Sequence, residues 1–377
     1  MKILHVIPSV SERSGGPATA IVPMCRALMQ QGTEVLLVST TEGLSEEPGK
    51  IEYKGVPAMF FPPQLGASFK YSRPLATWLS SNVKNFDLAH IHAVFNHSSV
   101  SASQACRKAG VPYIIRPLGT LDPWSMTQKS VRKRLFWKVS GKAMLHHAAA
   151  VHYTSEAEKL STERHLGLNH GKVIALGIDA HNSNSNGRMF SEPYVLVLSR
   201  LHPKKALDVL IEAFQVLIQN RKFADWRLVI AGDGPPDYVS KLKAQVAATD
   251  RITFTGWLDD DKKQEVLGGA SLLALPSHQE NFGLCVMEAL SHSVPVLVSP
   301  NVNLATEIVS ANAGWISAID KDALAARLAE ALSDEDELVK RGRAGKHLSQ
   351  KYSWENVVKG LINLYEEILP QRRKVAK

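Results

Sequence analysis

The 377-residue sequence has few cysteines and no long apolar run. Cys25, Cys106 and Cys285 lie far apart and form no C-x-x-C pair, which argues against a disulfide framework and a structural zinc site. No stretch approaches the roughly eighteen consecutive apolar residues of a membrane helix. Residues 1–8 have the pattern of a short strand rather than of a signal peptide, so we expect a cytoplasmic protein.

The G-x-G-x-x-G fingerprint is missing from the turn after the first apolar strand. Ser14, Gly15, Gly16 and Pro17 stand there instead, which counts against a dinucleotide-dependent oxidoreductase. The net charge of +8 favours an anionic partner: a nucleic acid, an acidic membrane or a phosphorylated substrate. No basic stripe interleaved with aromatic residues is present, so nucleic acid is the weakest of the three candidates.

Apolar strands alternate with helical segments along most of the chain, which predicts doubly wound parallel sheets. In the first half we expect strands at 3–7, 34–38, 88–92, 113–115, 150–153 and 172–176, and a short strand pair or loop within 51–63. In the second half we expect strands at 194–199, 226–231, 251–255, 271–276 and 295–299. The polar run 178–187 is typical of a linker, so we predict domains at 1–177 and 178–355.

A polar turn between a strand and a helix, residues 277–290, is the most informative stretch. Glu280 and Glu288 bracket it. Gly283 permits close approach of a ligand to the backbone, and the amides of Phe282, Gly283 and Leu284 would lie at the positive end of the following helix. This combination predicts an anion site, most simply for phosphate.

The run Glu280-Asn281-Phe282-Gly283, followed after four residues by Glu288-Ala289-Leu290, closely resembles the E-x7-E signature of retaining nucleotide-sugar glycosyltransferases of family GT4. The resemblance extends over essentially the whole chain. It implies the GT-B fold: two Rossmann-like doubly wound parallel-sheet domains, an interdomain cleft, and a C-terminal helix, about 356–377, that crosses back onto the first domain. In the alternative interpretation, Glu280 is only a favourable negative charge near the start of a helix, and Glu288 is a solvated side chain on that helix.

The segment after the strand at 194–199 is similar to the family's G-R-L-x-x-x-K-G motif, with Ser199 and Ala206 in place of the glycines. The resemblance implies that Arg200 and Lys205 neutralise the departing diphosphate, although a solvated basic turn also fits. It further implies that Glu280 holds the donor sugar and Glu288 the ribose. Asn281, Phe282 and Gly283 are the implied contacts to sugar and phosphate.

Further nucleotide contacts are implied at Gly256, Trp257, Leu258 and Leu284. For residues 256–258, an ordinary glycine turn after a strand is an equally good explanation. The resemblance places Gly15 and Gly16 in a loop that approaches phosphate or sugar. It is an ordinary turn in the alternative interpretation.

Histidines gather around the strand at 88–92, and His90 and His92 share one face of it. A metal site is conceivable, but no cysteine or carboxylate completes the ligand set, so buried hydrogen-bonded histidines are the simpler prediction. Asn96 and His97 are candidate sugar contacts. Where many relatives have a histidine, this sequence has Leu118, and Arg116 or His97 are candidates to replace it.

Residues 129–138 combine basic and aromatic side chains. The pattern occurs in helices on anionic membranes, but a solvated helix whose Phe136 and Trp137 enter the core is the favoured interpretation. Peripheral association with the inner face of the plasma membrane is therefore an open alternative.

The resemblance implies a hexosyltransferase that acts on a UDP-sugar, with UDP-glucose as the first guess. The acceptor would be a sugar hydroxyl in polysaccharide or lipid-linked oligosaccharide synthesis. With basic side chains at the phosphates, we expect neither a cofactor nor a divalent metal. The alternatives are a GT-B-type epimerase or phosphorylase, and a non-catalytic nucleotide-sugar-binding component of a polysaccharide assembly complex.

Overall fold

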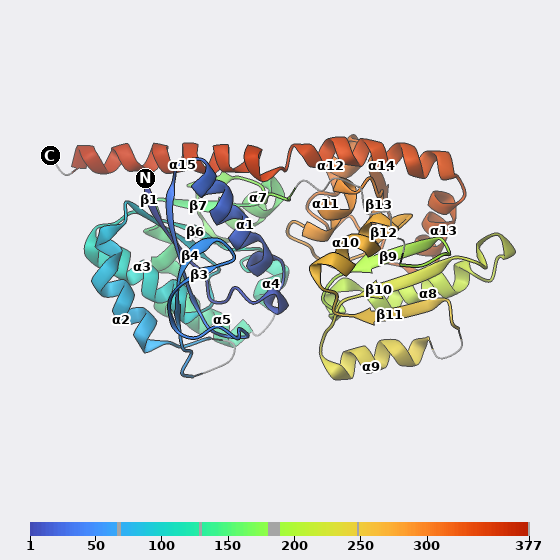
Figure 1. Cartoon of the computed structure of the whole chain (residues 1–377), viewed down its shortest axis with the longest axis horizontal. Helices are drawn as coiled ribbons and strands as arrows, with labels where there is room; N and C mark the ends of the chain where they lie inside the picture. The colour runs from blue at the N-terminus through green and yellow to red at the C-terminus, as the bar shows by residue number, and fades with distance from the viewer. Residues whose placement is uncertain (66–68, 128–129, 180–188, 247–248, 376–377) are drawn as a thin grey trace. The chain divides into compact units, whose positions relative to one another are not determined.

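The computed structural model describes residues 1–65, 69–127, 130–179, 189–246 and 249–375 (Figure 1). The chain divides into two compact units. Unit 1 comprises Met1–Gly177 and Trp354–Lys377, and unit 2 comprises Ile178–Ser353. From residue 180 onward, the expected linker lies outside the described residues.

Unit 1 contains an eight-stranded sheet with the order β3-β4-β2-β1-β5-β6-β7-β8. Its strands pair in parallel, except for the antiparallel pair of β3 and β4. All six strands expected in this half are present, and the irregular segment forms the antiparallel pair. The strands are β1 (Lys2–Val6), β2 (Glu34–Thr40), β3 (Gly49–Tyr53), β4 (Val56–Phe61), β5 (Leu88–His92), β6 (Tyr113–Arg116), β7 (Ala150–Tyr153) and β8 (Gly171–Val173).

Helices flank this sheet, and the C-terminal helix α15 (Trp354–Val375) lies beside α1 (Gly16–Gln30) (Figure 1). Tyr365 of α15 is fully buried in unit 1, and Lys172 of β8 forms an ion pair with Glu367. The remaining helices of this unit are α2 (Arg73–Asn82), α3 (His97–Ala109), α4 (Pro123–Thr127), α5 (Ser130–Phe136), a π-helical turn (Trp137–Gly141), α6 (Lys142–His146) and α7 (Glu156–Leu166).

Unit 2 contains a six-stranded, fully parallel sheet with the order β11-β10-β9-β12-β13-β14. In chain order this is 3-2-1-4-5-6, the arrangement of doubly wound nucleotide-binding sheets. The strands are β9 (Tyr194–Leu198), β10 (Arg227–Ala231), β11 (Ile252–Gly256), β12 (Leu272–Leu275), β13 (Val296–Val298) and β14 (Gly314–Ile316). The helices are α8 (Leu207–Leu217), α9 (Pro236–Gln245), α10 (Asp260–Gly268), α11 (Leu284–Ser291), α12 (Ala305–Ser310), α13 (Lys321–Leu332) and α14 (Glu335–Gln350).

Each unit has its own buried apolar core. In unit 2 the core joins β9, β10 and β12 to α8 and α13, with Phe214 and Leu328 fully buried. In unit 1 it joins β1, β5 and β6 to α2 and α3. Two doubly wound α/β units confirm the predicted fold class. Among the described residues, no helix combines the length and the apolar character that a membrane span requires.

Candidate active site

The sheet of unit 2 changes its winding direction between β9 and β12, which lie side by side although β10 and β11 separate them in the chain. Open α/β sheets bind ligands at the carboxyl ends of strands at such a switch point. The loop after β9 brings Lys205 there, and the loop after β12 brings Glu280. The His278 amide donates a hydrogen bond to the Lys204 carbonyl at 2.8 Å, which ties the two loops together.

Lys205 and Glu280 form an ion pair at this switch point, with only 13% and 17% of their side chains exposed. Burial acts to raise the pKa of the Glu280 carboxyl, but the Lys205 ammonium and neighbouring basic side chains outweigh it and lower that pKa. Glu280 is therefore a carboxylate at neutral pH, available to accept hydrogen bonds.

The Glu280 backbone is held in place by the loop after β13. Its amide donates to the Asn301 carbonyl at 3.1 Å, and its carbonyl accepts from the Asn303 amide at 3.0 Å. The Asn303 side chain also donates to Asn281 Oδ1 at 3.4 Å. These contacts hold the backbone of Glu280 and Asn281 in place, while Lys205 orients the Glu280 carboxylate. No sequence pattern pointed to Asn301 and Asn303, because only the pairing of β12 with β13 brings them near Glu280.

Helix α11 begins directly after Gly283, which has a φ of 73°. A Cβ atom there would lie 3.3 Å from Val286 Cγ2 and 3.4 Å from Glu280 Cγ. The side chain of Phe282 is buried and contacts the Tyr352 ring edge-on at 5.7 Å, so only its backbone faces the turn. The first amides of a helix have no intrahelical acceptor, so the turn at Gly283 and Leu284 suits an anion.

Glu288, one helical stretch further on, is paired with Lys263 of α10 at 2.9 Å. Both side chains are about four-fifths buried, at 23% and 22% exposure. Burial acts to lower the Lys263 pKa, but the charge and hydrogen bond of Glu288 raise it above its ordinary value. The sequence-based prediction did not include Lys263, which the packing of α10 on α11 places beside Glu288.

The basic segment after β9 keeps the backbone geometry that glycine would allow. Ala206 has a φ of 50°, a left-handed conformation that is uncommon for alanine, at the position where the family motif has glycine. Arg200 is exposed, and its charge contributes to the low pKa of Glu280. Arg200, Lys205 and Glu280 are thus electrostatically coupled, as one site requires.

Two further strands of unit 2, β10 and β11, end in glycine-containing loops, and the second loop is the one in which nucleotide contacts are predicted. Gly232 and Gly234, after β10, lie so close to the backbone of Ser199 and Leu201 that neither position has room for a Cβ atom. Gly256, the last residue of β11, has a φ of 72°, and its carbonyl accepts a hydrogen bond from the Gly232 amide. Beyond it, Trp257 is 42% exposed and Leu258 is partly buried. Gly232 and Gly234 thus have a packing role and Gly256 a conformational one, and contact of the loop after β11 with a base stays a prediction.

In unit 1 the corresponding switch point lies between β1 and β5. Gly15, with a φ of 97°, precedes α1, and Gly16 is its first residue. Asn96 and His97 stand at the start of α3, after β5. The fold therefore brings these four predicted site residues to the same edge of one sheet.

Asn96 and His97 make structural hydrogen bonds there. Asn96 caps α3 by accepting from the Ser99 amide at 2.9 Å, and its side chain is buried. His97 Nδ1 accepts from the Ser72 amide at 3.2 Å, and its Nε2 bonds with Ser101 Oγ at 3.3 Å. Since both ring nitrogens of His97 have partners, a sugar contact by this ring would require one of these bonds to break.

Arg116 is buried at the end of β6 near four histidines of β1, β5 and β7: His5, His90, His92 and His152. Its Nε and Nη2 atoms have no hydrogen-bond partner in the described part of the chain. Burial lowers the Arg116 pKa to about 10, and the nearby Glu158 charge opposes this shift. Only 1% of Arg116 is exposed, so this position suits a structural role better than contact with a sugar.

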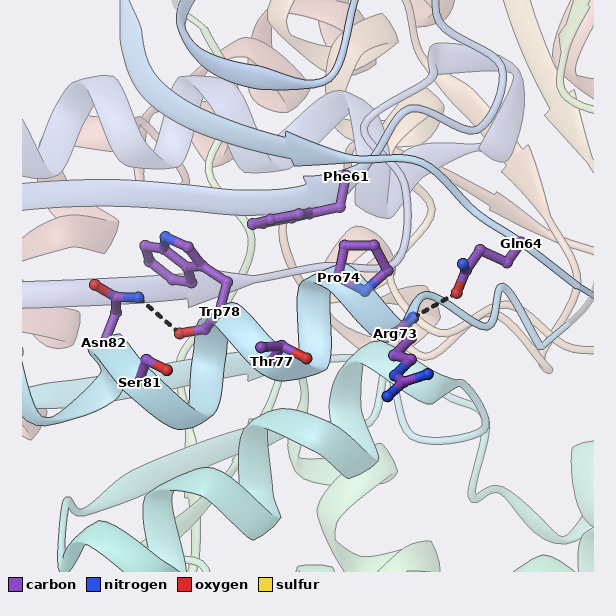
Figure 2. Close-up of a pocket in the computed structure, with 8 residues that line it drawn as sticks. All are labelled: Phe61, Gln64, Arg73, Pro74, Thr77, Trp78, Ser81 and Asn82. Carbon is purple, nitrogen blue, oxygen red and sulfur yellow. Dashed lines mark hydrogen bonds between the residues drawn. The ribbon is translucent and has the colours of Figure 1, made fainter.

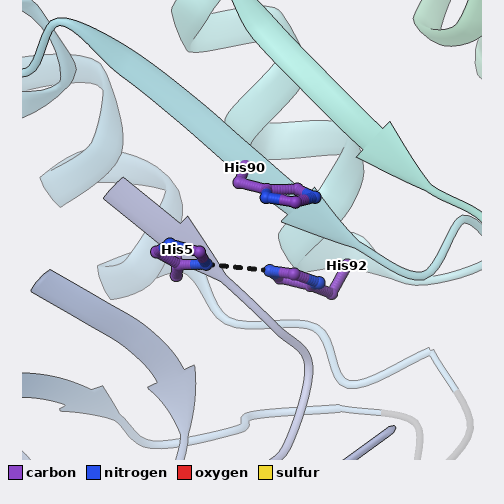
Figure 3. Close-up of side chains that lie close together, drawn as sticks. All are labelled: His5, His90 and His92. Atoms are coloured by element: carbon purple, nitrogen blue, oxygen red, sulfur yellow. Dashed lines mark hydrogen bonds between the residues drawn. The ribbon is translucent and has the colours of Figure 1, made fainter. Parts of the chain in front are cut away.

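His5, His90 and His92 lie close enough together to be considered as metal ligands (Figure 3). A hydrogen bond of 3.1 Å joins His5 Nδ1 to His92 Nε2. Burial, followed by the Arg116 charge, lowers the His5 pKa to about 3. A divalent cation would add to the charge of Arg116 in the same buried volume, so we interpret the group as a core network of neutral rings.

A second branch of this network connects to α15. A carbonyl can only accept, so His152 Nε2 donates to the Ile174 carbonyl, at 2.7 Å. In neutral rings, His90 Nε2 then donates to His152 Nδ1 at 3.1 Å, and the Tyr365 hydroxyl donates to His90 Nδ1 at 2.8 Å. The histidine network thereby fastens the C-terminal helix to the sheet.

Leu118, at the position of the family's histidine, has an uncommon left-handed backbone with a φ of 61°. Next to it, the Gly119 amide donates to the buried carboxylate of Glu158 at 2.7 Å. Glu158 also accepts from the amide and hydroxyl of Thr154. These hydrogen bonds to Glu158 hold the loop next to Leu118 in place, although Leu118 itself offers no polar group to a ligand.

Unit 1 also has an open groove of about 560 Å³ between the end of β4 and helix α2 (Figure 2). Phe61 and Trp78 form its aromatic part, with ring centroids 5.9 Å apart. Polar side chains surround them, of which Gln64 accepts from the Arg73 amide. The lining residues are Phe61, Gln64, Arg73, Pro74, Thr77, Trp78, Ser81 and Asn82.

Two family models match the chain, one for each unit. Residues 15–177 match the glycosyl transferase 4-like domain, and residues 180–348 match glycosyl transferases group 1. Each candidate site at a switch point falls within one of these matches.

Curated relatives include glycosyltransferases. An uncharacterised glycosyltransferase of Methanocaldococcus jannaschii is 30% identical over 188 residues, which is 48% of this chain and 47% of that protein. The D-inositol 3-phosphate glycosyltransferase of Nocardia farcinica is 30% identical over 186 residues, 47% of this chain and 41% of that protein. The alignments thus cover about half the chain, and the chain spans less than half the length of these relatives.

Solved structures match over nearly the full length. Sucrose-phosphate synthase from Thermosynechococcus elongatus has a TM-score of 0.81 at 19% identity, covering 98% of this chain and 99% of that one. Anabaena HepE in complex with UDP and glucose has a TM-score of 0.77 at 19% identity, covering 97% and 100%. Together with the two family models, these matches show that the chain belongs to the GT4-type glycosyltransferases of the GT-B fold.

Proposed function

We propose that this glycosyltransferase transfers a hexose from a UDP-sugar, first of all UDP-glucose, to a saccharide hydroxyl with retention at the anomeric carbon. The observation that carries the proposal is the pairing of Lys205 with Glu280 at the switch point of unit 2, beside the start of α11. Such a site offers cations, helix amides and a carboxylate at the ends of two adjacent strands. HepE, a structural relative, was crystallised with UDP-glucose.

The charges of this site match the needs of the reaction. As the bond from the sugar to the diphosphate breaks, negative charge grows on the diphosphate. Arg200, Lys205 and the amides at Gly283 stabilise that charge. The acceptor oxygen forms the new bond to the anomeric carbon, and its proton passes to the departing diphosphate. Because side chains and amides supply the positive charge, we propose that no divalent metal and no cofactor is required.

The two glutamates recognise hydroxyl groups. Lys205 has three donors, so it can contact a phosphate oxygen while it continues to orient Glu280. Glu280 accepts hydrogen bonds from the donor sugar, and Glu288, oriented by Lys263, accepts from the ribose. Trp257 offers an exposed ring for the base. The acceptor binds to unit 1, whose groove beside Trp78 joins aromatic and polar groups as a saccharide would require.

Release of UDP from a panel of nucleotide sugars, with and without saccharide acceptors, tests this proposal. Donors are first ranked by their effect on the melting temperature, since a bound donor stabilises the fold. We expect Lys205→Ala to reduce turnover by about 10²–10³-fold, as loss of one stabilising donor does. Lys172→Ala, which breaks an exposed ion pair in unit 1, is the matched control. A chelator should leave the rate unchanged.

The outcomes separate the alternatives. Turnover by Lys205→Ala at the wild-type rate would contradict the proposed site, and inversion in the product's anomeric NMR signal would contradict retention. Conversion of one UDP-sugar into another without acceptor would show an epimerase. Sugar 1-phosphate formed with inorganic phosphate would indicate a phosphorylase. UDP binding without turnover of any donor would indicate a non-catalytic binding component.

A further inference from the structure

Helix α5 and the π-helical turn after it expose aliphatic side chains to solvent. Val131, Leu135 and Val139 are 73%, 65% and 72% exposed. Because they are four residues apart, they fall on one helical face, and we call these three residues the aliphatic stripe. A surface helix normally turns its apolar face to the core. The stripe therefore has no explanation in the packing of unit 1.

The inner face of this segment is already fully used. Phe136 packs on Phe95 with ring centroids 5.1 Å apart, and Lys133 lies 5.0 Å from the centre of the Phe95 ring. Trp137 packs against Gly141, where a Cβ atom would lie only 2.9 Å from the indole. The aromatic residues of the segment thus belong to the core side, and the outer surface is aliphatic and basic.

The charge around the aliphatic stripe has one sign. No Asp or Glu occurs between Asp122 and Glu156, a stretch with six Lys and Arg residues. Arg132, Lys138 and Lys142 are exposed beside the stripe. Within the described residues, no ion pair involves these three side chains. The surface therefore combines apolar contact area with uncompensated positive charge.

We propose that the aliphatic stripe and its basic neighbours dock unit 1 on an anionic lipid bilayer. The three aliphatic side chains enter the boundary between headgroups and acyl chains, and the cations contact lipid phosphates. A protein partner fits less well, because the cores of protein interfaces are depleted in Lys and enriched in aromatic residues, which here point inward. Docking would bring this unit to a surface where lipid-linked substrates reside.

Site-specific fluorescence tests the insertion directly. Burial raises the pKa of the Cys106 and Cys285 thiols to about 12 and also that of Cys25, so an added exposed cysteine is labelled preferentially. We expect an environment-sensitive dye on Leu135→Cys to shift to shorter wavelength with equimolar phosphatidylcholine and phosphatidylglycerol vesicles. The control is Leu160→Cys, 59% exposed on α7 of the same unit, whose dye should not shift.

Vesicle co-sedimentation tests the two components separately. Changing Val131, Leu135 and Val139 to Ser should weaken binding about tenfold or more, whereas Leu160, Val309 and Val339, also exposed, serve as the control serine set. Changing Arg132, Lys138 and Lys142 to Gln should weaken it about fivefold per residue. Exposed Lys84, Lys241 and Lys351 form the control glutamine set.

The proposal would be overturned by no binding to anionic vesicles, by equal binding to pure phosphatidylcholine vesicles, or by full binding of the serine variant. Self-association through the stripe, seen as a dimer that the serine variant abolishes, would also overturn it. UDP binding in solution should be unchanged in the serine and glutamine variants. A protein that binds vesicles but not UDP would therefore refute the proposed function and leave this inference standing.

Discussion

Gly283 shows how a single residue can control the candidate active site. Its φ of 73° is costly for other residues, by roughly 1–2 kcal/mol, and a Cβ atom would press on Glu280 and Val286. We expect Gly283→Ala to move the start of α11 and to weaken UDP binding about tenfold. Isothermal titration of UDP into the variant measures this change, and the melting temperature records the accompanying strain.

Gly110 offers a matched control for this experiment. It has a φ of 64° at the end of α3, and a Cβ atom there would meet no atom within 4 Å. Gly110→Ala should therefore lower the melting temperature through backbone strain alone and leave UDP affinity unchanged. Equal loss of UDP affinity in both variants would mean that general destabilisation, rather than the geometry of the turn, accounts for the result.

Sequence patterns located some site residues better than others, for a physical reason. Lys205 and Glu280 follow adjacent parallel strands, so their proximity follows from topology. Lys263 could not be found this way, because the packing angle of α10 on α11 decides its contact with Glu288. Arg116 was placed correctly at a strand end, but β6 is buried on both faces, so its last side chain also lies in the core.

Some secondary-structure elements likewise follow from the local sequence pattern, whereas others depend on their partners in the fold. Central parallel strands such as β9 and β12 are buried on both faces and appear in the sequence as continuous apolar runs. β14, with only three residues, lacks enough length to show a pattern. β3 is an edge strand with exposed Lys50 and Glu52, so its pairing with β4 decides its structure.

Helix α15 carries the prediction at this scale. Tyr365→Phe removes the hydroxyl that donates to His90 Nδ1 and leaves a buried acceptor without its partner. Such a loss costs about 1–3 kcal/mol. We therefore expect faster amide hydrogen exchange along α15, with the largest change near Tyr365, and a lower melting temperature.

Tyr71→Phe is the control for the loss of a hydroxyl. Tyr71 is partly buried, and its ring contacts the tilted His97 ring with centroids 4.3 Å apart, a contact that phenylalanine would keep. Amide hydrogen exchange along α15 in the Tyr71→Phe variant should match that of the wild type. If Tyr365→Phe also exchanged at the wild-type rate, the hydrogen bond to His90 would not contribute to holding the helix.

At the scale of the whole molecule, we expect the stability of the two units to depend differently on pH. Unit 1 buries His5, His90, His92 and His152, and burial is the largest cause that lowers the pKa of each ring. His5 and His152 reach a pKa of about 3. An unfolded histidine titrates near pH ~6.5, so unfolding of unit 1 takes up protons below that pH.

Unit 1 is therefore expected to lose stability as the pH falls. Since the folded-state pKa is depressed, these rings stabilise unit 1 fully above about pH 6.5, and this contribution is lost progressively toward about pH 3. Four such groups give a slope of up to about 5 kcal/mol per pH unit. We expect amides of β1, β5 and β7 to lose hydrogen-exchange protection between about pH 6.5 and 5, before those of β9 and β12.

His5→Gln should reduce the slope of unfolding free energy against pH by about a quarter, whereas His147→Gln, at an exposed position, should not reduce it. Simultaneous loss of protection in both units would show that the histidine network does not govern the acid response.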